Sequence, residues 1–444
     1  MRKGQRIVVR TGGGWLSLFL LTLLLTSCSL SAGRDPHEVL FWTTMTDPVT
    51  MGVQQQIIKA FERENPDLHV RMVGMPSAST GDATALITAV RGGSPPDVYL
   101  LDRFTVNQQA SIGLLTNLAP YVAREKINLA QNYLPFAWNE IMYQGSPYAL
   151  PIETDARVLY YNKDLLRQAG IDPDLLNSDH GPITIDALIA LAQRVNQVDA
   201  HGNYTQMGFI PWAGQGEFAT WSLNLGARYF NPRTCQLTLT EPAIMQTYQD
   251  FATWAKELNY AKVDTFLATY QPPNAPPGQA PFLTGHLALS IDGNWNTNGI
   301  RLYAPKLNYG VTYLPVAKKG DQSTTWAGGF ALVMPTGALN ASAGYRFMRF
   351  MTGEEGQRIS VQSTGDLPTW TSLYHDKQLF ANQPALFQQI MLHARSRVPL
   401  PIGAQLWDAM TTAQEEVLLG DETPRQALDD AQSRVQPLMQ QYCP

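Results

Sequence analysis

Short apolar segments alternate with segments of helical periodicity near the start of the chain, and this order restricts the folds open to it. Residues 38–42 (EVLFW) and 98–101 (VYLL) are apolar runs, and residues 69–73 (HVRMV) alternate between polar and apolar, so all three are predicted strands. The segment between the strands at 38–42 and 69–73 carries apolar residues at the spacing of one helix face: Val53, Ile57 and Phe61. Strands that alternate with helices of this length indicate βαβ units and an α/β architecture.

Later segments follow the same pattern and carry local signals for where helices begin. Asp82 and Thr184 precede two of the predicted helices, as N-capping residues do. Thr423 is followed by a proline and then by Gln426, which suits an N-cap with a capping box. Residues 271–281 hold five prolines and are predicted to be a surface loop. Just before Thr423 lies an amphipathic stripe of Leu406, Met410, Ala413 and Val417.

The first 27 residues have a different character from the rest of the chain. A start with four basic side chains is followed by an apolar run at 15–25, which is too short to span a bilayer and is typical of a secretory signal. The Leu-Thr-Ser-Cys sequence that ends at Cys28 resembles a bacterial lipobox, although an ordinary cleaved signal remains the alternative. We therefore predict a lipoprotein signal peptide over residues 1–27, lipidation of Cys28 and a tether over 28–37. The protein is expected to be exported and anchored by lipid to the outer face of the cell membrane, or to be periplasmic.

The charge of the remaining chain excludes two classes of partner. Without residues 1–27, Lys+Arg falls from 32 to 28 against 37 Asp+Glu, a net charge of about −9. No basic block remains, which argues against nucleic acid and against membrane contact other than through the lipid anchor. The chain is also too long for one small core and suggests two lobes.

Cys235 and Cys443 remain as a pair if Cys28 carries lipid. In an oxidising compartment the pair can form a disulfide, and two unpaired buried thiols are the alternative. Spacing in the sequence does not decide between them, because bonding depends on how close the two Cα atoms come.

Motifs for catalysis are absent from the sequence. There is no GxSxG nucleophile elbow, HExxH zinc helix or GxxxxGK[ST] phosphate loop, and the seven histidines are scattered. We therefore predict no catalytic residue, no metal and no cofactor. Paired carboxylates from distant strands, as in a secreted glycosidase, are the one enzyme alternative.

Six segments resemble segments of bacterial extracellular solute-binding protein family 1, which includes the maltodextrin-binding proteins. They occur in the same order along the chain as in that family. His286 departs from the pattern, since the family usually has Lys there. The resembling segments are residues 95–104 (PPDVYLLDRF), 145–165 (GSPYALP with VLYYNKDL), 282–295 (FLTGHLALSIDGNW), 308–315 (NYGVTYLP), 326–330 (WAGGF) and 345–357 (YRFMRFMTGEEGQ).

The resemblance implies a type II periplasmic-binding fold, an α/β architecture of two lobes with a hinge and a ligand cleft between them. The N-terminal lobe would comprise residues 38–149 with 331–379, and the C-terminal lobe residues 152–328 with 384–444. The hinges would fall at residues 150–151, 328–331 and 380–383, where proline and a glycine pair suit segments that take up backbone rotation.

Aromatic side chains are candidate platforms for the flat C–H faces of a sugar. Trp295 and Trp407 match family positions that stack on sugar rings. Trp221 lies in a segment similar to the family's cleft, with a core position as the alternative. Trp212, in a loop, and Trp42, at the end of the first strand, are further candidates.

Polar partners for the hydroxyl groups are predicted at the ends of strands, where open α/β sheets bind ligands. Asp102 and Arg103 match the family's Asp-Arg pair, with a local salt bridge as the alternative. Asp155 matches a cleft carboxylate just past the first hinge, and Glu153 is its neighbour. Asp47, in the loop after the first strand, completes the predicted site.

The resemblance implies a monomeric substrate-binding component of an ABC importer, not an enzyme. It would capture a sugar or oligosaccharide by hinge closure and deliver it to the permease subunits. A binding protein of the same fold for a polyamine, sugar phosphate or peptide is the alternative, and a secreted glycosidase is a more distant one.

Overall fold

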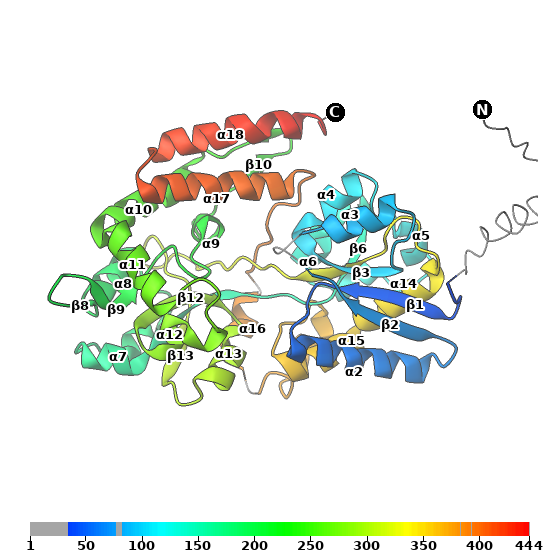
Figure 1. Cartoon of the computed structure of the whole chain (residues 1–444), viewed down its shortest axis with the longest axis horizontal. Helices are drawn as coiled ribbons and strands as arrows, with labels where there is room; N and C mark the ends of the chain where they lie inside the picture. The colour runs from blue at the N-terminus through cyan, green and yellow to red at the C-terminus, as the bar shows by residue number, and fades with distance from the viewer. Residues whose placement is uncertain (1–33, 77–81, 382, 392, 444) are drawn as a thin grey trace, which may run out of the picture.

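Two five-stranded sheets form the centres of two halves that lie side by side (Figure 1). The computed structural model describes residues 34–76, 82–381, 383–391 and 393–443. In spatial order the first sheet contains β2 (His69–Gly74), β1 (Glu38–Thr43), β3 (Val98–Asp102), β14 (Phe330–Val333) and β6 (Ala149–Pro151). The second contains β13 (Tyr309–Thr312), β7 (Arg157–Asn162), β12 (Leu287–Gly293), β9 (Tyr204–Phe209) and β8 (Gln197–Val198).

The first sheet confirms the strands predicted near the start of the chain. β1 pairs in parallel with both β2 and β3, as βαβ units require, whereas β14 runs antiparallel to β3 and to β6. The apolar stripe Val53, Ile57 and Phe61 lies on α2 and is buried. The helices of this half are α2 (Pro48–Glu64), α3 (Thr84–Arg91), α4 (Val106–Ser111), α5 (Ala119–Val122), α6 (Pro135–Glu140), α14 (Ala341–Met351) and α15 (Glu354–Thr364), and a small hairpin joins β4 (Met142–Tyr143) to β5 (Ser146–Pro147).

The second sheet has β12 at its centre, and β7 beside it is buried along its whole length between β12 and β13, with which it runs antiparallel. Its helices are α7 (Lys163–Gln168), α8 (Ile185–Gln193), α9 (Phe218–Asn224), α10 (Pro242–Leu258), α11 (Tyr260–Tyr270), α12 (Pro281–Thr284) and α13 (Asn296–Tyr303). The predicted cap of α8 is confirmed, because the Thr184 hydroxyl accepts the backbone N–H of Ala187.

The chain crosses between the two halves three times. It leaves the first sheet after β6 for β7, returns between β13 and β14, and crosses again between α15 and α17 (Gly403–Leu419), with α16 (Leu386–Met391) on the way. The first and third crossings are joined by a pair of backbone hydrogen bonds between Thr154 and Leu367. These segments separate the two sheets and leave a space between them.

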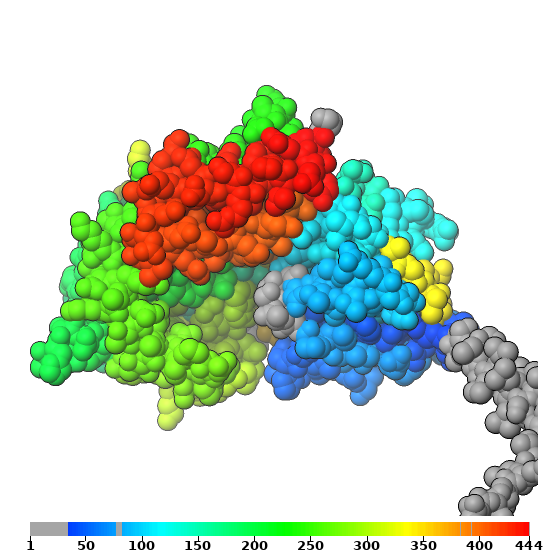
Figure 2. Space-filling model, turned by 45° about the horizontal axis from the view of Figure 1, so that its top comes forward, coloured from blue at the N-terminus to red at the C-terminus, as the bar shows by residue number. Residues whose placement is uncertain are grey.

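Helices α17 and α18 (Pro424–Gln440) cover the second half and extend towards the first, where their orange and red atoms meet blue and cyan ones (Figure 2). The predicted stripe of α17 is buried, and Thr423 and Gln426 form the predicted capping box of α18. At the beginning of α17, the backbone N–H of Ala404 donates to the Gln108 side chain on α4. This helix therefore contacts both halves.

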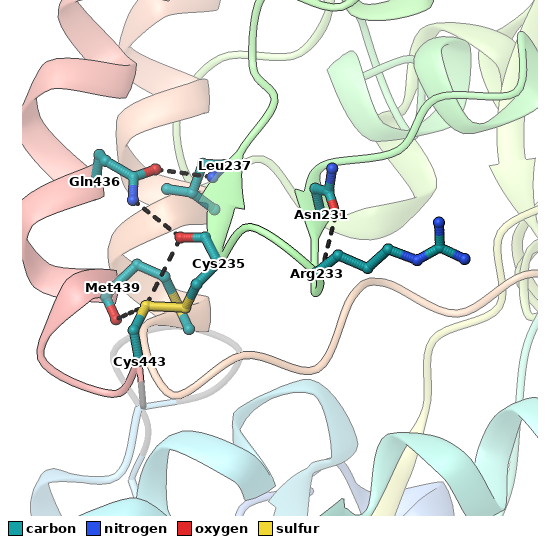
Figure 3. The surroundings of a disulfide bond; sticks show 7 residues. All are labelled: Asn231, Arg233, Cys235, Leu237, Gln436, Met439 and Cys443. Atoms are coloured by element: carbon teal, nitrogen blue, oxygen red, sulfur yellow. Dashed lines mark hydrogen bonds between the residues drawn. A yellow bond between two sulfur atoms is a disulfide. The ribbon is translucent and has the colours of Figure 1, made fainter.

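A disulfide joins Cys235 to Cys443 beyond the end of α18 (Figure 3). Cys235 lies in the tight turn between β10 (Phe230–Asn231) and β11 (Gln236–Leu237), with a φ of 53°. The side-chain amide of Gln436 on α18 also donates to the Cys235 carbonyl and accepts from the Leu237 N–H. The end of the chain is thereby attached to a hairpin of the second half.

Within the part of the chain that the structure describes, no helix combines the length and apolar character that crossing a bilayer requires. The predicted signal peptide and Cys28 lie outside the described residues.

Candidate functional site

A cavity of about 1090 Å³ lies between the two halves and is the best candidate for a ligand site. The first half contributes Asp47, which caps α2, and Asp102, at the end of β3. The second half contributes Trp295, before α13, and Trp407, on α17. Clefts of this size between domains are typical of sites that enclose small molecules.

Trp295 is held in place by an arginine and a glycine. The guanidinium of Arg157, on β7, lies 3.4 Å from the ring centroid of Trp326 and 5.2 Å from that of Trp295. Gly293 lies directly under the Trp295 ring, because a Cβ atom there would fall 2.2 Å from it. Trp295 is still 38% exposed. Its ring can therefore serve as a fixed apolar platform.

Trp407 belongs to an aromatic cluster that joins the two halves. Its ring lies 4.8 Å from Phe218 and 5.7 Å from Phe104, measured between centroids. The guanidinium of Arg397 lies 4.3 Å from the Phe104 ring, and its Nη2 donates to Asp102 at 2.7 Å. The second aromatic wall of the cavity thus combines side chains from both halves.

Charged side chains around the cavity are mostly acidic. Among the described lining residues there are two arginines, Arg157 and Arg397, and no lysine or histidine. Each arginine forms an ion pair with a lining carboxylate, Arg157 with Asp155 and Arg397 with Asp102. The eight lining carboxylates are Asp47, Asp82, Asp102, Glu153, Asp155, Glu217, Asp366 and Asp408.

Two of these carboxylates lie on the first crossing segment and accept hydrogen bonds from the second. The Glu153 side chain accepts the backbone N–H of Phe330 at 2.8 Å, and Asp155 accepts that of Gly328 at 2.5 Å. Gly329 has a φ of 121°, and a Cβ atom there would fall 2.5 Å from the Glu153 carbonyl. Only glycine fits between the two crossings at this position.

Burial and mutual repulsion raise the pKa values of several lining carboxylates and so disfavour their ionisation. The pKa of Asp366 rises from 3.8 to about 6, first because of burial and then because of Asp155 and Asp47, although a hydrogen bond from Thr364 opposes the rise. Burial also raises the pKa of Glu153 well above its usual value, with Asp366 and Asp155 adding to the effect. Across the cavity, burial raises the pKa of Glu217, against the influence of Arg157 and Arg397. Raised pKa values of carboxylates are common at functional sites.

Six of the ten predicted site residues line this cavity: Asp47, Asp102, Glu153, Asp155, Trp295 and Trp407. They come from distant parts of the chain and are brought together by the crossing segments. The other four do not line it.

Arg103 is fully buried and does not reach the cavity. Its Nε donates to Glu140 at 2.7 Å and its Nη1 to the Glu153 carbonyl at 2.6 Å, while its Nη2 donates to the Gly328 carbonyl. The structure does not place Arg103 at the predicted ligand contact, because the side chain is fully buried and each of its three guanidinium nitrogens donates within the protein. Arg103 instead connects the first two crossing segments.

The remaining predicted tryptophans also lie elsewhere. Trp221 is 2% exposed, and its indole N–H donates to the carbonyls of Pro211 and Gly216, which places it in the core. Trp212 lines a separate cavity of about 470 Å³ beside Tyr260. Trp42 packs on the first sheet next to Tyr99. The location of each tryptophan is set by how its segment packs in the fold, which sequence spacing does not reveal.

The structure adds site residues that the sequence did not single out. Trp326 lay within a segment that resembles the family and Arg157 directly before one, but nothing local marked them as cavity residues. Glu217, Asp366 and Arg397 had no signal at all, because each follows a turn or crossing whose path depends on the fold. No group of His, Cys, Asp and Glu in the described residues is arranged to hold a metal ion.

Several known proteins of similar sequence are sugar-binding proteins. The chain is 23% identical over 389 residues to a maltotriose-binding protein of Pyrococcus abyssi, covering 86% of this chain and 77% of that protein. It is 22% identical over 435 residues to a maltooligosaccharide ABC transporter solute-binding lipoprotein of Streptococcus pneumoniae strain R6, with 95% of each covered.

Solved structures share the fold. CpMnBP1 with mannotriose bound has a TM-score of 0.77 at 22% identity, covering 89% of this chain and 99% of that one. The sugar-binding protein MalE of Xanthomonas citri has a TM-score of 0.71 at 20% identity, covering 91% and 98%. The α/β fold of two halves is therefore that of periplasmic sugar-binding proteins, as predicted. Since residues 50–358, well over half of the chain, match the family of bacterial extracellular solute-binding proteins, this protein belongs to that family.

Proposed function

We propose that the protein captures a sugar or oligosaccharide in the cavity between its two halves and delivers it to the permease of an ABC importer. The observation that carries this function is the composition of the cavity. Exposed aromatic rings such as Trp295 suit the C–H faces of a sugar, and the surrounding carboxylates and arginines suit its hydroxyl groups. The sugar-binding relatives support the same class of ligand.

The site residues are proposed from both halves. Trp295 and Trp407 would hold the sugar rings, and Asp47, Asp102, Glu153 and Asp155 would accept hydrogen bonds from hydroxyl groups. Arg157 and Arg397 would donate hydrogen bonds to other hydroxyl groups. Because these groups sit on different halves, a ligand that contacts them all would draw the halves together.

The lobes are proposed with the boundaries predicted from the resemblance: residues 38–149 with 331–379, and 152–328 with 384–444. The protein would act as a monomer, held to the membrane by lipid on Cys28, and present its closed form to the permease. We propose that it performs no chemistry and that the sugar leaves unchanged.

The test is a thermal-shift screen of the mature protein over mono- and oligosaccharides. A ligand that binds only the folded state raises the unfolding temperature, because it stabilises that state by RT ln(1 + [L]/Kd). Chromatography of the recovered ligand should show intact sugar. Absence of any shift with sugars would contradict the ligand class, and accumulation of cleaved sugar would show an enzyme.

A further inference from the structure

The balance of charge in the cavity is more extreme than recognition of a neutral sugar requires. Eight carboxylates and two guanidiniums line it, and each guanidinium is already paired with one of those carboxylates. The described lining therefore has six more acidic than basic side chains. An anionic ligand such as a sugar phosphate would be repelled, whereas a cationic group would be attracted.

The excess is concentrated on one side of the cavity. Glu153 and Asp155 lie two positions apart in the sequence. Their side chains are fixed because they accept the backbone N–H groups of Phe330 and Gly328. Asp366 is close enough for its charge to interact with both members of this pair, and Asp47 is close enough to interact with Asp366. An ammonium group placed among the four would replace repulsion between carboxylates with charge-assisted hydrogen bonds.

A second feature, on the aromatic side, requires a different kind of ligand atom. Arg397 lines the cavity but is only 9% exposed, and its Nε has no hydrogen-bond partner. A buried donor without an acceptor is costly, so an oxygen acceptor beside Arg397 would stabilise the closed cavity. Its guanidinium lies 5.4 Å from the Trp407 ring centroid, so the acceptor would belong to a ring that stacks there.

We propose that the ligand is an amino sugar, a hexosamine or its oligosaccharide with free amino groups. The inference rests on the proposed function and narrows it. The ammonium group meets the carboxylates around Glu153 and Asp366, a hydroxyl or ring oxygen accepts from Arg397, and the C–H faces lie on Trp295 and Trp407. A neutral sugar lacks the charge, and a polyamine lacks the oxygen acceptor and the flat face.

Calorimetry with a matched pair of ligands tests the proposal. Glucosamine oligosaccharides with free amino groups are compared with N-acetylated oligosaccharides of the same length, at a pH at which the amines are protonated. An opposite charge at about 4–6 Å favours an ionised group by 1–3 pKa units, so the charged ligand should bind at least about tenfold more tightly. The preference should shrink as salt is added, since salt screens charge.

Substitution locates the effect. Asp366→Asn should weaken binding of the free amine more than binding of the N-acetylated ligand, so the ratio of the two affinities should fall. Asp430→Asn, which removes the same charge on the exposed face of α18, should change neither.

Three results would overturn the inference, and they distinguish it from the proposed function. Equal binding of neutral and charged oligosaccharides would overturn the amino sugar but leave sugar capture standing. Binding of spermidine with no binding of any sugar would overturn both. A preference for the free amine that survives intact in Asp366→Asn would remove the assignment to this carboxylate cluster.

Discussion

Arg157 joins an aromatic and an acidic part of the cavity. It lies between Trp326 and Trp295, pairs with Asp155, and donates to Gln215 at 3.1 Å. One buried guanidinium therefore orients an aromatic platform and a carboxylate together. Because both groups are fixed before the ligand arrives, little conformational freedom is lost on binding.

Replacing the platforms should weaken ligand binding. Trp295→Ala should cost about 1–3 kcal/mol of binding free energy, since a stacking surface is lost, and leave the unfolding temperature nearly unchanged because the ring is partly exposed. Trp407→Ala should weaken binding similarly but also destabilise the protein, because its ring packs on Phe104 and Phe218.

Calorimetry and thermal denaturation measure the two effects separately. Trp212→Ala is the matched control, since Trp212 lines a different cavity and its loss should leave binding intact. Normal binding by both Trp295→Ala and Trp407→Ala would show that neither ring holds the ligand.

The carboxyl group of Asp366 should make stability depend on pH. Its pKa is raised from 3.8 to about 6, so between these values the folded state keeps a proton that the unfolded state releases. Its contribution to stability is therefore complete below about pH 4 and is lost as pH rises through about 6.

Asp366→Asn should remove this loss. Without ligand, the variant should unfold at a higher temperature than the wild type above pH 6, and the difference should narrow towards pH 4. Thermal denaturation on both sides of that window measures the effect. Parallel curves for the two proteins would show that Asp366 ionises normally.

At the level of elements, the crossing segments and the C-terminal helices position the site. Arg103 bonds the carbonyls of Glu153 and Gly328 and so connects two crossings from beneath the cavity. Helix α17 carries Trp407 and at its beginning bonds to α4. Helix α18 packs on α17 and is attached to the β10–β11 hairpin by the disulfide.

Removing the disulfide should lower stability without affecting binding. The Cys235→Ser, Cys443→Ser double variant loses a cross-link between residues 208 positions apart, and we expect its free energy of unfolding to fall by about 2–4 kcal/mol. Neither cysteine lines the cavity, so ligand affinity should be retained. Denaturant unfolding and calorimetry give the two values, and equal stability of oxidised wild type and variant would contradict the expectation.

For the whole molecule, the structure suggests how ligand binding would become a signal. The proposed contacts lie on two halves joined by three crossings, so the most compact form makes the most contacts with the ligand. A ligand shifts the population of forms by no more than its difference in affinity between them.

Ligand should therefore make the protein more compact. Small-angle scattering of the mature protein should show a smaller radius of gyration when saturating sugar is present, and Trp295→Ala should need more sugar to reach it. An unchanged radius of gyration at saturation would contradict hinge closure.

Anchoring should depend on Cys28. Cys28→Ala should abolish labelling by radioactive fatty acid and leave the protein released or unprocessed, because the predicted lipid is attached to that sulfur. Detergent partitioning of cells that express each form measures this. Equal membrane retention and labelling of the variant would contradict the lipobox.

The sequence alone determined the α/β class of this protein and several of its elements. Period-two and helical patterns, caps such as Thr184 and Thr423, and the segments that resemble the family were sufficient for the α/β fold, because these signals act between residues a few positions apart. Positions at and after strand ends also pointed to Asp102 and Asp47, whereas Asp155 was found through the resemblance to the family.

Tertiary structure alone decided which side chains share the cavity. Asp102 meets Arg397 across 295 positions, and no local pattern encodes that meeting. Burial also divides residues that look alike in sequence, since Trp221 bonds inside the core while Trp295 remains partly exposed. The physical reason is that the neighbours of a side chain in space decide whether its polar groups are hydrogen-bonded and whether it is excluded from water. The three crossings determine which residues become those neighbours.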